Sequence, residues 1–100
     1  MAKSTKTWKI GERCQGGVIT VEIIGKVIAI IGKEWDTSAG FKKSSNQSNA
    51  KEFTRGTIDS TDREAEHKCF MFLTDLTSAY YADEIIKWIK TKVKFERNFW

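Results

Sequence analysis

Two β-branched runs separated by a Gly-Lys pair constrain this chain more than any other feature. The runs cover residues 18–24 (Val-Ile-Thr-Val-Glu-Ile-Ile) and residues 27–31 (Val-Ile-Ala-Ile-Ile). β-Branched side chains suit the pleated, half-buried surface of a sheet. A glycine at the first position of a two-residue loop supplies the positive φ of a type II′ turn. We therefore predict a β-hairpin that turns at Gly25 and Lys26.

Strand-like segments flank this hairpin on both sides. Residues 7–14 alternate imperfectly and end at a flexible Gly-Gly pair, so we expect a first strand there. Residues 51–58 resume an alternating pattern and predict a fourth strand. The intervening residues 37–50 are rich in Ser, Thr, Asn, Gln, Gly and Ala, which indicates a long flexible loop of the kind that is usually functional or disordered. The sheet is expected to be a four-stranded antiparallel meander over about residues 7–58.

After residue 58 the spacing of the apolar residues changes from that of a strand to that of a helix. Thr61 and Glu64 have the spacing of a capping box, which predicts the start of a helix. The apolar positions that follow share one helical face: Ala65, Cys69, Phe72, Leu73 and Leu76. An alternative interpretation takes residues 67–73 as a fifth, fully buried strand.

A second helical stripe comes after Thr77 and Ser78, where the helix can kink or a new one can begin. Its members again fall on one face: Tyr81, Ile85, Trp88, Ile89 and Val93. The helical part covers about residues 61–94, as one long or kinked helix or as two helices. The predicted fold class is α+β, with a four-stranded antiparallel meander followed by C-terminal helix.

Size and composition bound the remaining possibilities. With 100 residues, of which 40% are hydrophobic, the chain can bury one core, so we expect a single domain over residues 1–100. The longest apolar-rich run, residues 18–31, is interrupted by polar residues and is not expected to span a membrane. Two cysteines and no recognisable leader segment favour an intracellular location, cytoplasmic or nucleoid-associated.

Few residues suggest catalysis. His67 is the only histidine, and Cys14 and Cys69 do not form a CxxC pair. The seven glycines show neither a GxGxxG motif nor a P-loop spacing. We therefore expect no enzyme activity, no metal site and no cofactor. A hydrolase or metal enzyme that depends on His67 is kept as the third and least favoured class.

Positive charge is concentrated in the predicted sheet. Residues 5–58 carry nine basic and five acidic residues, a surplus equal to the net charge of +4 of the whole chain. Exposed lysines and arginines can contact the phosphates of a single strand, and Trp35 can stack on a base. In the competing interpretation, Trp8 and Trp35 cap the core and the lysines form an ordinary solvated face. The candidate nucleic-acid-binding residues are Lys9, Arg13, Lys26, Lys33, Trp35, Lys42, Lys43, Lys51 and Arg55.

Three short motifs resemble one known family. Ile10-Gly11 opens a strand, Gly25-Lys26-Val27 turns a hairpin, and Lys33-Glu34-Trp35 ends the next strand. Together they resemble the positive-cofactor-four transcriptional coactivators, whose fold is shared by the Whirly proteins. The resemblance implies single-stranded DNA binding across a curved sheet and dimerisation through the helices. It also implies that Lys26 and Trp35 correspond to the family's basic and tryptophan positions, whereas residues 59–62 are acidic or polar where the family is basic.

These observations lead to one expected function and one alternative. We expect a single-stranded nucleic-acid-binding protein, a transcription or replication accessory factor, with DNA favoured over RNA. Helical apolar residues outside the two stripes predict a homodimer through the helices: Phe70, Met71, Tyr80 and Ile86. The alternative is a small protein-interaction module, of the inhibitor or immunity type, that does not bind nucleic acid.

Overall fold

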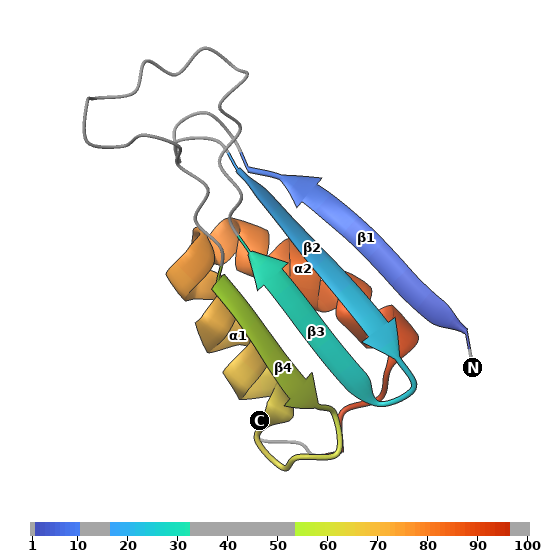
Figure 1. Ribbon diagram of the computed structural model, residues 1–100. Coiled ribbons are helices and arrows are strands. Elements are labelled where there is room, and N and C mark those ends of the chain that lie inside the picture. Colours follow the sequence, from blue (N-terminus) through green and yellow to red (C-terminus); the bar gives the residue numbers. More distant parts are fainter. Residues whose placement is uncertain (1, 11–16, 33–53, 97–100) are drawn as a thin grey trace, which may run out of the picture.

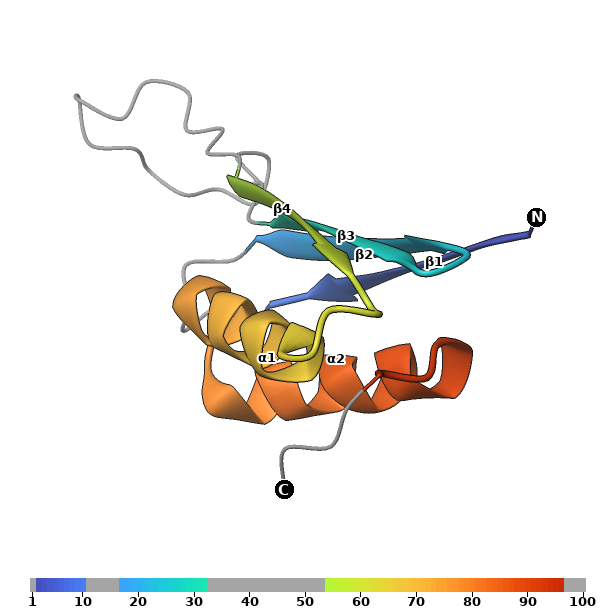
Figure 2. The same cartoon turned by 90° about the horizontal axis from the view of Figure 1, so that it is seen from below.

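The computed structural model describes residues 2–10, 17–32 and 54–96 of the chain. In these ranges the elements follow the order β1 (Lys3–Lys9), β2 (Val18–Ile24), β3 (Val27–Gly32), β4 (Thr54–Asp59), α1 (Ala65–Leu76) and α2 (Ala79–Lys92). The four strands form one antiparallel sheet in the order β1-β2-β3-β4. Both helices lie on the same face of this sheet (Figures 1 and 2). The predicted α+β meander with C-terminal helices is therefore confirmed.

The β2–β3 hairpin forms as predicted. Ile24 pairs with Val27 across a two-residue loop, and Gly25 has a φ of 59°. This conformation is strained for residues with a Cβ atom and is readily adopted by glycine.

The prediction of the first strand at residues 7–14 was wrong in its boundaries. β1 begins at Lys3 and pairs with the whole length of β2, from Lys3 opposite Ile24 to Lys9 opposite Val18. The physical reason is that β2 offers seven residues for pairing, although β1 has little apolar alternation of its own. Residues 11–14 lie outside the described residues, as do residues 51–53 of the predicted fourth strand and the loop at 37–50. β4 runs from Thr54 to Asp59.

The core lies between one face of the sheet and the two helices. Alternate residues of β2 and β3 are fully or almost fully buried: Ile19, Val21, Ile23, Ile28 and Ile30. The helices contribute Cys69, Leu73, Leu76, Ala82, Ile85 and Ile89 to the same cluster. Most positions of the two predicted stripes therefore face the core. Ile86, expected on the helix surface, is only 6% exposed and belongs to the core.

Two separate helices form, joined at Thr77 and Ser78. Residues 67–73 lie within α1, so the alternative of a fifth strand was wrong.

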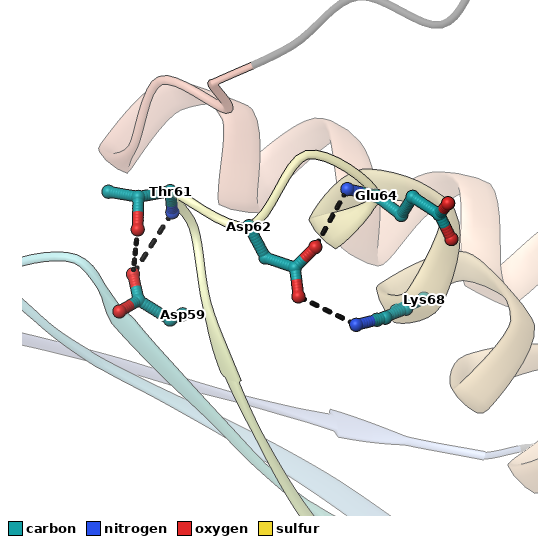
Figure 3. A network of polar contacts seen from close by, with 5 residues as sticks. All are labelled: Asp59, Thr61, Asp62, Glu64 and Lys68. Carbon is teal, nitrogen blue, oxygen red and sulfur yellow. Dashed lines mark hydrogen bonds and ion pairs between the residues drawn. The ribbon is translucent and has the colours of Figure 1, made fainter.

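The predicted capping box was also wrong. The Thr61 hydroxyl donates to Asp59 Oδ1 at 2.9 Å, and the backbone N–H of Glu64 donates to Asp62 Oδ1, also at 2.9 Å (Figure 3). Asp62 thus accepts the N–H that a capping threonine would have accepted, and α1 begins one residue after Glu64.

Two glycines allow α1 to approach the sheet closely. A Cβ atom on Gly32 would lie 2.5 Å from Leu76 Cδ1, and one on Gly56 would lie 3.0 Å from the Phe72 ring. Leu76 is buried, so it cannot move away without disturbing its neighbours.

We predict that Gly32→Ala lowers the free energy of unfolding by about 1–3 kcal/mol, because the added methyl overpacks the core. Leu76→Ala alone should cost about 2–5 kcal/mol. In the double variant the clash is removed, so its loss of stability should be smaller than the sum of the losses in the two single variants. Urea unfolding of the four proteins measures this coupling, and strictly additive losses would contradict the close contact.

Candidate nucleic-acid interface

No helix or strand in the described part of the chain covers the face of the sheet opposite α1 and α2 (Figure 2). Because side chains alternate along a strand, its members are the residues between the buried ones. We call this surface the open face, and its described members are Lys3, Thr5, Thr7, Lys9, Val18, Thr20, Glu22, Ile24, Val27, Ala29, Ile31, Arg55, Thr57 and Asp59. The strand register arranges most of them in rows across the sheet.

Two of the predicted phosphate contacts, Lys9 and Arg55, lie at one end of the open face. Arg55 is in the row of Thr7, Thr20 and Ile31, and Lys9 stands two residues beyond Thr7 on β1. Both side chains belong to exposed residues and have no ion pair with any described residue. Two cations that are 46 positions apart in the chain therefore lie at the same end of the open face, on its two opposite edge strands.

The connections that carry most of the other candidates begin and end at this same end of the sheet. The Ile10 N–H donates to the Gly17 carbonyl at 2.9 Å, and Gly32 pairs with Thr54. The candidates within these connections lie outside the described residues: Arg13, Lys33, Trp35, Lys42, Lys43 and Lys51.

Lys26 does not lie at the same end of the sheet as Lys9 and Arg55. It lies in the hairpin loop at the opposite end, where its carbonyl accepts the Ser60 N–H at 2.8 Å. The charge of Lys26 acts on the carboxylate of Asp59, at the end of β4. Asp59 lies four residues beyond Arg55 in this strand, and a strand rises about 3.3 Å per residue. Lys26 is therefore separated from the basic end by most of the length of β4.

The open face also carries residues that the charge argument did not identify. Four threonines project from it, and the hydroxyls of Thr7 and Thr20 lie 3.1 Å apart. Lys3 Nζ is 3.7 Å from Glu22 Oε2 in an ion pair between neighbouring strands. An alternating β pattern read from Lys3 onward would have placed Lys3 and Thr5 on this face, but the predicted first strand began at residue 7.

No aromatic residue is found among the described members of the open face. Trp8 points to the helix side, where its ring centroid lies 5.5 Å from that of Trp88. It packs against the buried core, as the competing interpretation predicted for this residue.

An acidic turn connects β4 to α1 (Figure 3). The backbone N–H of Thr61, and then its hydroxyl, donates to Asp59 and lowers the pKa of this carboxyl from 3.8; the charge of Lys26 makes a smaller contribution. The Lys68 ammonium, 2.6 Å from Asp62 Oδ2, is the largest cause of the lowered pKa of Asp62. These hydrogen bonds favour the charged form of the two carboxylates.

His67 and Cys69 lie apart from the open face, and Cys14 lies outside the described residues. His67 is an exposed residue of α1, and Cys69 is buried in the core, where desolvation raises its pKa to about 12. Within the three described ranges, no group of three or more His, Cys, Asp or Glu residues could hold a metal ion. A search of those same ranges finds no helix that is long and apolar enough to cross a membrane.

Comparisons of the chain with protein-family models, with curated proteins and with solved structures find no match. The resemblance to the positive-cofactor-four and Whirly proteins stays a prediction from the three short motifs.

The acidic turn leads to a prediction about pH. Because the pKa of Asp62 is lowered in the folded protein, its carboxylate stabilises the fold above its unfolded pKa, and this contribution is lost as pH falls through the folded pKa. Asp62→Asn should therefore be less stable than the wild type at about pH 7 and equally stable at about pH 2.

Urea unfolding at both pH values measures the difference. Asp75→Asn is the matched control, since Asp75 is exposed on α1 and has no hydrogen bond or ion pair with a described residue. A stability difference for Asp62→Asn that persists in acid would contradict the assignment.

Proposed function

We propose that the protein binds single-stranded nucleic acid along the open face, with DNA favoured over RNA, as an accessory factor in transcription or replication. The observation that carries the proposal is the position of Lys9 and Arg55. They project from the uncovered side of the sheet, at the end from which the basic connections depart. Phosphates attract such side chains without regard to sequence.

Several other described residues of the open face suit a flexible polyanion, although Glu22 and Asp59 carry negative charge there. Threonine hydroxyls can donate to phosphate oxygens. The Lys3–Glu22 pair is exposed and therefore weak, so Lys3 can exchange its carboxylate for a phosphate. The apolar positions Ile24, Val27 and Ile31 offer contact to sugars and bases without reading a sequence. These properties support a binding mode with little base specificity.

The proposal includes a second copy of the chain that packs on the helices. Met71 is 48% exposed and Tyr80 is 67% exposed, and neither is needed for the core. The same two residues favour the alternative function, a protein-interaction module, because they could equally dock another protein. A stoichiometric protein partner together with indifference to nucleic acid would favour that alternative.

We expect a fluorescein-labelled oligothymidine to bind with an affinity that falls as salt rises, by a slope of about 0.7 per phosphate neutralised. The variant Lys9→Gln/Arg55→Gln should bind more weakly, and its slope should be smaller by about 0.7 for each contact removed. Fluorescence anisotropy titrations at several salt concentrations measure both quantities.

The control is Lys87→Gln/Lys94→Gln, which makes the same change in net charge at exposed positions on and just after α2. This variant should keep nearly the wild-type affinity. Wild-type protein that shows no salt-sensitive binding at micromolar concentration would refute the proposed function, and equal losses in both variants would refute the assignment to the open face.

A further inference from the structure

A second surface combines aromatic rings with positive charge, on the helix side of β1. The Trp8 and Trp88 rings meet edge to face, with centroids 5.5 Å apart and an interplanar angle of 76°. Lys6 Nζ lies 5.3 Å from the centroid of the Trp8 ring, and Lys92 Nζ lies 5.8 Å from that of the Trp88 ring. We call these four residues the β1–α2 seam.

Both rings of the seam border solvent. Trp8 and Trp88 are half-buried, whereas Lys6 and Lys92 are exposed. Because the ammonium group over each ring is itself exposed to water, a ligand can reach that ring from solvent. A cation–π contact at such a site is weak, and stacking of a nucleobase on an aromatic side chain is stronger. A base can therefore displace the ammonium, which is then free to pair with a phosphate.

The position of the seam connects it with the open face. β1 is an edge strand, and α2 passes behind the sheet (Figure 1). Alternation along β1 directs Lys3 and Lys9 to the open face and Lys6 to the helix side. Neither Lys6 nor Lys92 forms an ion pair with a described acidic residue. The edge of the sheet is thus basic on both of its sides, which complements a polyanion that crosses it.

We propose that a single-stranded nucleic acid on the open face continues around the edge of β1 and ends on the seam. One base stacks on the indole of Trp8 or Trp88, and Lys6 and Lys92 pair with the phosphates beside it. This inference rests on the proposed function, because it extends the path of the same ligand. It also assigns base stacking to residues that lie off the open face.

The length of the ligand tests this path. A short labelled oligothymidine of about 5 nucleotides should cover the open face alone, and one of about 15 nucleotides should also reach the seam. We expect the longer oligonucleotide to bind wild-type protein more tightly, and Lys6→Gln/Lys92→Gln to lose this gain while its affinity for the short one changes little. Lys6→Arg/Lys92→Arg keeps both charges and should retain the gain.

Lys87→Gln/Lys94→Gln again serves as the control of equal charge, and thermal unfolding shows whether each variant is folded. Tryptophan emission reports on stacking. The longer oligonucleotide should quench it in the wild type, and by less in Trp8→Phe/Trp88→Phe.

The outcomes separate this inference from the proposed function. Wild-type protein that binds neither oligonucleotide overturns both. If Lys9→Gln/Arg55→Gln weakens binding and Lys6→Gln/Lys92→Gln does not, only the seam is overturned. If the seam variant alone weakens binding, the open face is overturned, and so is the path that leads from it to the seam. Quenching that the two phenylalanine substitutions leave unchanged overturns the assignment of stacking to the seam.

Discussion

The packing of one sheet face on two helices determines the rest of this structure. Ile19, Ile28 and Ile30 from the central strands meet Leu73 and Ile85 from the helices in a core with no exposed surface at these side chains. An antiparallel sheet can bury one face and leave the other in water. Because both helices pack on the same side, no described element covers the opposite face. The candidate interface is therefore a consequence of how the core is built, and its residues are those that alternation excludes from the core.

Local signals in the sequence were sufficient for the hairpin and the helices. Gly25 has the positive φ that the predicted turn requires, and each helix shows its buried stripe in the spacing of its own apolar residues. The start of β1 could not be predicted in this way. Its seven residues include one large apolar side chain, Trp8, so the strand is specified by its partner β2 and not by its own pattern. The start of α1 was missed because the Thr61 hydroxyl donates to Asp59, while Asp62 accepts the Glu64 N–H that Thr61 was expected to accept.

The sequence allowed the residue types of the candidate site to be predicted, but only partly their positions relative to one another. The charge count over residues 5–58 included Lys9 and Arg55, but their position at the same end of the open face follows from the pairing of four strands, which no local pattern contains. Lys26 was grouped with them although the hairpin directs it to the opposite end of the sheet. Lys6 and Trp8 were counted with the sheet, yet their register turns both toward the helices.

The rings of the seam and the open face lie on different sides of β1, and this has a consequence for the proposed recognition. Charge contacts and hydroxyl donors on the open face would bind any phosphate backbone, so they would set affinity and its dependence on salt but not the choice of base. Stacking on an indole adds affinity and tolerates all four bases, because every base has an aromatic face. A strand held by both surfaces must bend around an edge strand, which a flexible single strand can do and a stiff duplex cannot do at low cost. Preference for single strands over duplexes would then arise from the shape of the sheet edge, without any contact that reads the sequence.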